Sequence, residues 1–213
     1  MDIADPQVAP RRSPRGTDIT VIAPTRLEYL AVRAARPRCP VVHAGMGLTR
    51  GGVPAGRAVI VCGLAGGLTP DLKPGTVVVP DGVATGDGPL RDCDPRLARA
   101  LRDAARALGL PVVTGPLLTV PTMVTGDDRA VWAARGFVAA DMETALLPPA
   151  MPVATVRVVL DAVSRPISDR WAAPTPAALR PVLLGELVWL GWTAPRYALR
   201  AARVTAAALG LLV

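Results

Sequence analysis

The 213-residue sequence is short of several residue types, and each shortage excludes a class of protein. It has one histidine, His43, and three cysteines without CxxC spacing, Cys39, Cys62 and Cys93. Scattered cysteines in odd number beside a single histidine support neither a disulfide framework nor a zinc site. We therefore expect no metal and a reducing compartment, the cytoplasm.

Aromatic residues are also scarce, at 3% of the chain, although the formal net charge is +7. All of the 24 basic residues are arginine except Lys73, and they are scattered along the chain. Because there is neither a set of stacking rings nor a basic helical stripe, nucleic acid is not an expected partner. A loose attraction to phosphates or to anionic lipid headgroups stays open.

Long apolar runs are missing as well, despite a hydrophobic content of 51%. No run reaches the roughly 18 residues that a membrane-spanning helix needs. Residues 1–16, MDIADPQVAPRRSPRG, contain no apolar segment of signal-peptide length and read as a disordered leader. Residues 17–213 are long enough to form a single domain with a sizeable core and a helical tail.

Runs of β-branched residues alternate with helix-forming segments. Strands are expected at 18–23, 40–47, 57–68, 73–83, twice within 111–125, at 137–141 and at 151–161; helices are expected at 25–36, 94–110, 127–136 and from Pro174 onward, with a break at Pro195. This alternation predicts an α/β fold of three layers, with a mixed, mainly parallel sheet flanked by helices. The connection between 40–47 and 57–68 is too short for a full crossover helix.

Acids and glycines follow the expected strands. Glu28 comes after the first strand, glycine loops follow the next two as GMG (45–47) and GLAGG (63–67), and Asp141, Glu143 and Asp161 follow later strands. Ligands of such sheets bind beyond the carboxyl ends of the strands, so one crevice could hold all of these residues. Glutamate occurs only three times in the chain, so composition alone does not explain the choice of glutamate at position 143.

Each of these features also has a plainer explanation. Asp161 ends the apolar run RVVLD. A carboxyl group in such surroundings should bind its proton more tightly, as a general acid requires. An aspartate is also common in the turn that ends a strand. GLAGG suits the binding of an anion or a sugar by backbone N–H groups, although a tight turn suffices to explain it. No GxGxxG or Walker spacing follows it, so a dinucleotide or nucleotide loop is excluded.

The ordered set of a glutamate after the first strand, a GMG loop, GLAGGLTPDLKPGTVVVP, ADMETA and VRVVLD resembles the purine nucleoside phosphorylase and methylthioadenosine nucleosidase superfamily. The resemblance covers roughly residues 18–165 and is greatest to the branch associated with hopanoid biosynthesis. The chain departs from the family pattern at Leu64 and Leu160, where serine is common. Both departures put recognition of phosphate in question.

The resemblance implies roles for individual residues. Glu143 would bind the ribose 2′ and 3′ hydroxyls with Met142 against the sugar, Asp161 would protonate the purine at N7, and Glu28 would activate water. The substrate-binding set is completed by Asp141, Met46, Gly47, Ala65 and Gly66, and the candidates for contact with phosphate are Arg26, Arg50 and Arg157.

The expected function is cleavage of the N-glycosidic bond of an adenine nucleoside, with adenosylhopane as the first choice of substrate. Water or phosphate as acceptor is left open, so inorganic phosphate is the one co-substrate considered and no cofactor is expected. The alternatives are a nucleosidase for methylthioadenosine or futalosine, and a non-catalytic nucleoside- or lipid-binding protein. The resemblance implies a homo-oligomer, and Trp189, Leu190, Trp192 and Tyr197 could rest on a membrane or pack in a core or subunit interface.

Overall fold

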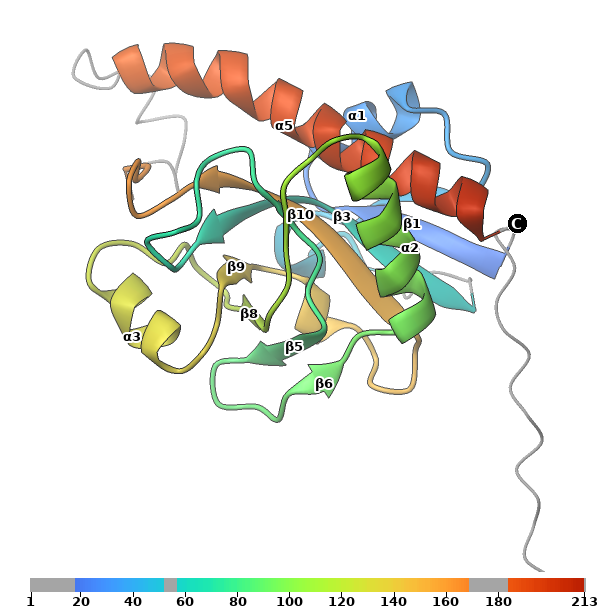
Figure 1. The fold of residues 1–213 in the computed structure, drawn as a ribbon, viewed down its shortest axis with the longest axis horizontal. Coiled ribbons are helices and arrows are strands. Elements are labelled where there is room, and N and C mark those ends of the chain that lie inside the picture. Colours follow the sequence, from blue (N-terminus) through green and yellow to red (C-terminus); the bar gives the residue numbers. More distant parts are fainter. Residues whose placement is uncertain (1–17, 52–56, 169–183, 213) are drawn as a thin grey trace, which may run out of the picture.

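The computed structural model describes residues 18–51, 57–168 and 184–212, which are built around one ten-stranded sheet (Figure 1). The expected leader, residues 1–16, lies outside the described residues. The strands are β1 Ile19–Ala23, β2 Val41–His43, β3 Ala58–Gly67, β4 Val77–Val78, β5 Gly82–Thr85, β6 Arg91–Asp92, β7 Val112–Val113, β8 Leu117–Thr119, β9 Ala139–Asp141 and β10 Val153–Asp161. Six strand pairs are parallel and three antiparallel, so the sheet is mixed and mainly parallel, as the sequence predicts.

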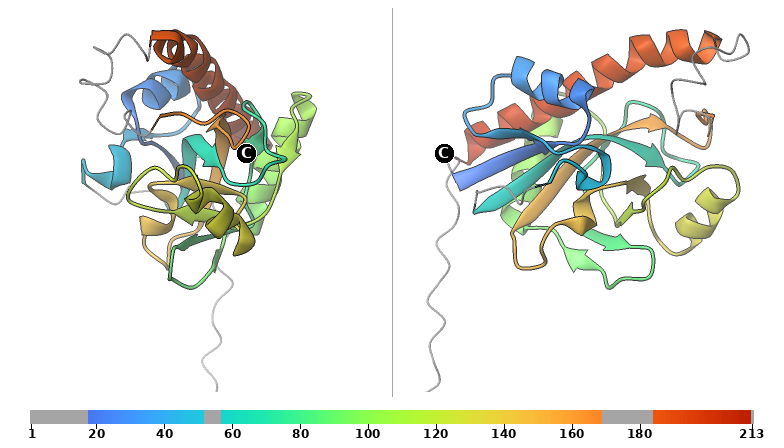
Figure 2. Two further views of the ribbon diagram at one scale, coloured as in Figure 1. Left: turned by 90° about the vertical axis from the view of Figure 1, so that its left-hand side faces the viewer. Right: turned by 180° about the vertical axis from the view of Figure 1, so that it is seen from behind.

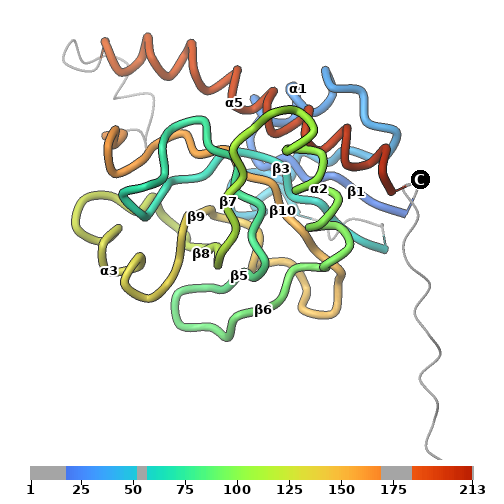
Figure 3. The backbone as a smooth tube through the Cα atoms, viewed as in Figure 1, coloured from blue at the N-terminus to red at the C-terminus, as the bar shows by residue number. Residues whose placement is uncertain are grey.

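The sheet follows the order β6-β5-β8-β9-β3-β10-β4-β7, and β1 pairs with β3 and β2. The long strands β3 and β10 form its centre and are almost wholly buried. Their parallel register sets Val156 opposite Cys62 and, after an irregularity, Asp161 opposite Gly66. At its carboxyl end β3 also pairs with β9 (Figure 3), and Asp141 is the last residue of β9.

The helices are α1 Arg26–Ala34, α2 Pro95–Ala107, α3 Asp128–Ala134 and α5 Leu184–Leu211, with short 3₁₀ helices η2 Met46–Leu48 and η3 Thr144–Leu146. Helix α5 packs against α1, α2, β3 and β10, whereas α3 lies beside β8 and β9, below α5 in the view of Figure 1 (Figures 1 and 2). Between β2 and β3, the described residues contain η2 and no crossover helix. None of the helices in the described ranges has both the length and the apolar character needed to cross a bilayer.

Local signals account for the ends of α2. Asp94 accepts hydrogen bonds from the backbone N–H groups of Arg96 and Leu97, and Pro95 occupies the first turn, where its missing N–H has no helical partner. Gly109 follows the helix at a φ of +69°, a left-handed conformation that glycine adopts without steric cost. These caps explain why the sequence predicts this helix well.

Two predicted elements are wrong. The expected strand 73–83 is two strands, β4 and β5, with Val79, Pro80 and Asp81 between them. Because proline has no N–H to donate to a ladder, the chain leaves β10 and β7 there and joins β8 and β6 instead.

The second wrong element is the break at Pro195, because α5 runs through this residue. A proline inside a helix costs about 3 kcal/mol. From Thr193 to Leu209, α5 buries one face of small and apolar residues against the sheet and its neighbouring helices, and this packing outweighs the local cost. The start that we expected for the tail, Pro174, lies outside the described residues, and the helix begins at Leu184.

Candidate active site

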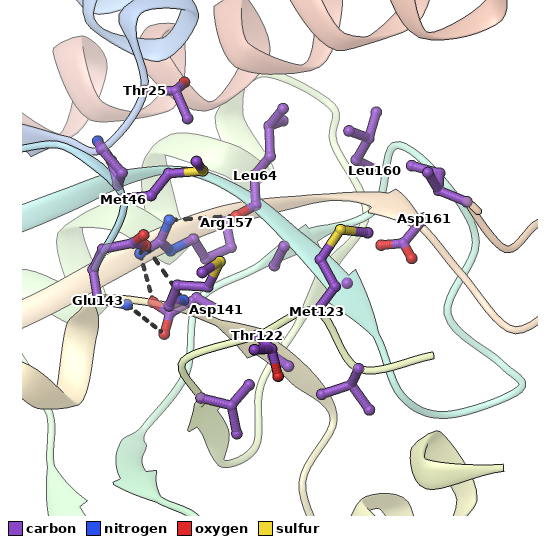
Figure 4. A pocket seen from close by; sticks show the side chains of 18 of the residues that line it. Thr25, Met46, Leu64, Thr122, Met123, Asp141, Glu143, Arg157, Leu160 and Asp161 are labelled. Atoms are coloured by element: carbon purple, nitrogen blue, oxygen red, sulfur yellow. Dashed lines mark hydrogen bonds and ion pairs between the residues drawn. The ribbon is translucent and has the colours of Figure 1, made fainter. Parts of the chain in front are cut away.

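A cavity of about 240 Å³ opens at the carboxyl ends of β3 and β10. Most of the residues that the sequence suggests for a site line it: Glu28, Met46, Ala65, Gly66, Asp141, Met142, Glu143, Arg157 and Asp161. The structure therefore brings the three acids at positions 28, 143 and 161 to one cavity. Figure 4 shows Glu143 and Asp161 on opposite sides of it, with Leu64 and Met123 between them.

Glu28 is buried at the start of α1 and closes a capping box with Thr25. Its Oε2 accepts hydrogen bonds from the backbone N and the Oγ1 of Thr25, both at 2.7 Å, and its Oε1 accepts one from the backbone N of Leu64 at 2.7 Å. A carboxylate offers about four acceptor positions, so one remains free. The capping box thus fixes Glu28 while leaving room for one further hydrogen bond.

The first glycine of GLAGG makes space for this carboxylate. A Cβ built on Gly63 would lie 2.3 Å from Oε1 of Glu28 and 2.9 Å from Nη1 of Arg157. Contacts this short do not occur, so any larger residue at position 63 would force one of the two charged side chains to move. The glycine motif therefore has a packing reason here beyond a tight turn.

Arg157 is fully buried on β10 and pairs with two carboxylates. Its Nη2 donates to Asp141, to Glu143 at 3.2 Å and to the Oγ1 of Thr144 at 3.1 Å, and its Nη1 donates to the carbonyl oxygen of Leu64 at 3.3 Å. Asp141 also accepts hydrogen bonds from the hydroxyl groups of Thr119 and Thr144. Asp141 therefore acts mainly as a support for Arg157 and the turn that follows β9.

Glu143 is held on both of its oxygens. Oε2 faces Arg157, and Oε1 accepts a hydrogen bond from the backbone N–H of Gly47 at 3.1 Å. Gly47 itself does not line the cavity, and its φ of +61° lets the η2 turn present this N–H group. Burial raises the pKa of Glu143, and the neighbouring Arg157 opposes this rise.

Asp161 is buried at the end of β10, on the other side of the cavity. Its Oδ2 accepts a hydrogen bond from Arg129, whose other terminal nitrogen donates to the carbonyl oxygen of Gly67 at 2.6 Å. A Cβ on Gly66 would lie 3.0 Å from Oδ1, so this glycine allows the acid to approach β3 closely. Burial raises the pKa of Asp161, while the charge and hydrogen bond of Arg129 lower it.

Sequence reasoning missed Arg129 altogether. It lies on α3, 32 positions from Asp161, among many other arginines, and no local pattern distinguishes it from the solvated ones. Thr119 and Thr144, which hold Asp141, were missed for the same reason. The DDR stretch at the start of α3 is the only local hint that a basic residue there sits close to acids.

The three arginines considered for phosphate are placed unfavourably. Arg157 lines the cavity, but both of its terminal nitrogens already donate hydrogen bonds to the protein. Arg26 and Arg50 are exposed and do not line the cavity. His43, which the sequence suggests is structural, stacks on Tyr29 with ring centroids 5.7 Å apart.

The remaining wall of the cavity is apolar. It is formed by aliphatic and methionine side chains: Met46, Leu64, Val120, Met123, Val124, Met142, Leu160 and Ile167. Among the lining residues that the structure describes, none carries an aromatic ring. A flat, apolar group could lie between the methionines while the carboxylates meet its polar partner.

Comparison with solved structures shows a shared fold. The chain is similar to a mutant of the Helicobacter pylori methylthioadenosine nucleosidase with 5′-methylthioadenosine in the active site, with a TM-score of 0.70, 12% identity and coverage of 94% of this chain and 100% of that one. It is similar to the futalosine hydrolase of Helicobacter pylori, with a TM-score of 0.68, 14% identity and coverage of 91% and 97%. It is also similar to the Neisseria meningitidis 5′-methylthioadenosine/S-adenosylhomocysteine nucleosidase in complex with methylthio-immucillin-A, with a TM-score of 0.69, 18% identity and coverage of 91% and 99%.

This structural likeness establishes the nucleoside phosphorylase-like fold. Because the identities are so low, it does not carry an activity from one protein to another. Comparison with curated protein sequences gives no match. The family profile described as the phosphorylase superfamily matches residues 54–172, more than half of the chain, and this range includes β3, β9 and β10, the strands that build the cavity. The chain belongs to the phosphorylase superfamily.

Proposed function

We propose that this protein hydrolyses the N-glycosidic bond of an adenine nucleoside. The observation that carries the proposal is that three buried carboxyl groups, from Glu28, Glu143 and Asp161, line one cavity, most of whose remaining lining residues are apolar. The cavity lies beyond the carboxyl ends of the central strands, where ligands of such sheets bind. The chain belongs to a superfamily that acts on nucleosides, and this supports cleavage of an N-glycosidic bond as the function of the three acids.

The proposed reaction gives each acid one task. Asp161 donates a proton to N7 of the purine as the bond between N9 and C1′ of the ribose breaks, and the electron pair of that bond stays on the base. The carboxylate of Glu143 faces the sugar and stabilises the positive charge that develops at C1′. A water molecule held by the free acceptor position of Glu28 attacks C1′ and gives its proton to that carboxylate.

Water is the acceptor that the electrostatics favour. Four carboxylates line the cavity, and the one lining cation in the described part of the chain is Arg157, which is already paired. A phosphate dianion would have to approach these acids without a free donor of opposite charge. A neutral water molecule meets no such repulsion.

The test is release of the free base from a short panel of nucleosides: methylthioadenosine, futalosine and adenosylhopane, each with and without phosphate. Mass spectrometry of the sugar product distinguishes the free 5′-substituted ribose, such as methylthioribose, from its 1-phosphate. Release of adenine from at least one of the adenine nucleosides without phosphate is expected. No base release from any of them would overturn the proposal, and a sugar 1-phosphate as the product would overturn the choice of water.

Asp161→Asn separates an enzyme from a binding protein. An enzyme should lose base release, by roughly 100-fold or more for the loss of a general acid, while adenine still binds. The surface substitution Asp103→Asn is the matched control, because this aspartate is half exposed and pairs with Arg106 at the surface. A variant Asp161→Asn that turns over like the wild type would remove the proposed role of this acid.

Adenosylhopane merits a place in the panel because of one exposed stripe on α5. Leu184, Val188 and Trp192 follow one another at four-residue spacing and are 53%, 71% and 66% exposed, and the guanidinium of Arg196 stacks 4.0 Å from the Trp192 ring. An apolar stripe next to arginine suits an anionic membrane surface, from which a lipid-linked nucleoside would come. The fraction of protein that sediments with anionic vesicles should fall for Trp192→Ala and stay unchanged for the control Leu108→Ala. Light scattering that shows a dimer held together by the same stripe would contradict membrane contact.

A further inference from the structure

We propose that Arg129 is a positioning residue for Asp161, which fixes the direction of this carboxyl group and controls how readily it gives up its proton. The inference rests on the proposed function, because it assigns a second residue to the proton transfer. It concerns a side chain from α3, an element that contributes no group to the cavity wall around Glu28 and Glu143.

The geometry is that of a clamp around one carboxyl group. Arg129 donates with one terminal nitrogen to Oδ2 of Asp161 and with the other to the carbonyl oxygen of Gly67. On the opposite side, Gly66 has no Cβ and so lets Oδ1 lie against β3. The acid is thereby fixed between the end of β3 and the guanidinium, at the wall of the cavity.

The burial of Arg129 is difficult to explain by stability alone. The two side chains of the pair are 4% and 8% exposed, and removal of two charges from water is expensive even when they meet. Moreover, the Nε of Arg129 is buried and has no hydrogen-bond partner in the described part of the chain. A fold selected only for stability would gain from apolar residues here, so a role in the site is the better explanation.

The electrostatic consequence is specific to Asp161. The described groups that face it are the guanidinium of Arg129, from α3, the backbone N–H of Ile167, which follows β10, and the backbone N–H of Asp161 itself. These groups lower the pKa of Asp161, and burial opposes them. Burial alone would raise the pKa of Asp161 further than it does in the presence of the arginine. An acid that held its proton more tightly would protonate a purine less readily.

The experiment is the pH profile of base release by the wild type, Arg129→Met and Arg129→Lys. For Arg129→Met we expect at least a tenfold loss of kcat near neutral pH, and a descending limb that moves upward by about one pH unit or more, the usual effect of losing an adjacent opposite charge. Arg129→Lys, which keeps the charge, should restore the position of the limb. Arg135→Met is the control, because this arginine lies partly exposed at the opposite, C-terminal end of α3, and it should leave the profile unchanged.

A uniform loss of rate with an unmoved limb would show that Arg129 is only structural and would overturn the inference. If Arg129→Met does not fold, Arg129→Gln retains a donor for the Gly67 carbonyl without the charge and is subject to the same criterion. If the wild type releases no base, the proposed function fails by itself. In that case the pH dependence of adenine binding tests the role of Arg129. A pH midpoint of binding that is the same in the wild type and the variants overturns this role. A pH midpoint that moves upward in the variants without the charge supports it.

Discussion

Arg157 and Glu143 meet inside the protein, with 3.2 Å between Nη2 of the arginine and Oε2 of the glutamate. Asp141 faces the same nitrogen, so one guanidinium pairs with two buried carboxylates. Replacement of Arg157 by Met would leave both acids without their cation in the interior. We expect the free energy of unfolding to fall by about 3–5 kcal/mol, as is usual when one partner of a buried pair is removed.

Urea denaturation at neutral pH measures this loss. Arg106→Met is the control, because Arg106 pairs with Asp103 at the surface, where both side chains are more than half exposed. Such a pair contributes about 0–1 kcal/mol. Equal losses in the free energy of unfolding for the two substitutions would show that the buried cluster stabilises the protein no more than the surface pair does.

Gly63→Ala tests the contact between the glycine motif and the acid of α1. The added methyl group would stand 2.3 Å from Oε1 of Glu28, so the carboxylate must move away from Leu64. Base release should fall at least tenfold, and the protein should lose about 1–3 kcal/mol of stability, as for other overpacked sites. Gly191→Ala in α5, where an added Cβ meets nothing, should instead be neutral or stabilising by about 0.5–1 kcal/mol. A Gly63→Ala variant with wild-type activity would mean that the position of Glu28 is not critical.

Base release should depend on pH in a bell shape. Glu143 must be ionised to stabilise the sugar cation, and burial raises its pKa above the ordinary value of 4.5 while Arg157 opposes the rise, so kcat/KM should climb as the pH passes through that raised pKa. Asp161 must carry a proton, and burial raises its pKa while Arg129 opposes the rise, so kcat/KM should fall again above it. Glu143→Gln should move the ascending limb, and Asp161→Asn should abolish the descending one in the residual activity. An ascending limb that is unmoved in Glu143→Gln would assign it to another group.

The same two pKa directions make a prediction about stability. A carboxyl group whose pKa is higher in the folded than in the unfolded state stabilises the fold at low pH, and this contribution is lost as the pH rises through the folded pKa. Glu143→Gln carries no ionisable group, so the free energy of unfolding of this variant should depend less on pH in that range than that of the wild type. Urea midpoints measured across acidic to neutral pH provide the comparison, and equal slopes for both proteins would contradict the shift.

Phosphate should have no effect on the rate, and neither should the loss of the two exposed arginines. Arg26→Ala and Arg50→Ala remove side chains that do not line the cavity, so kcat/KM for base release should change less than twofold, about 0.4 kcal/mol. Base release measured over a range of phosphate concentrations is the readout. A rate that needs phosphate and collapses in Arg50→Ala would favour phosphorolysis.

The local sequence predicted most elements of the fold for identifiable reasons. Asp94 and Pro95 start α2, Gly109 ends it, and β-branched runs give β3 and β10, because capping and side-chain alternation are encoded within a few residues. The prediction of a helix break at Pro195 was wrong because the rule against proline in helices considers only neighbouring residues. The helix is held by its packing on α1, α2 and the sheet, which involves residues far away in the sequence.

By itself, the sequence determined the α/β alternation and the positions of acids and glycines directly after strands. Only the tertiary structure decided that Glu28 would face Gly63, that Arg157 would be held by Asp141 and Glu143, and that Arg129 would reach Asp161. The physical reason is that strand order and register bring together residues that are 14 to 36 positions apart. No pattern in a chain with 24 basic residues marks which arginine will be buried beside which acid.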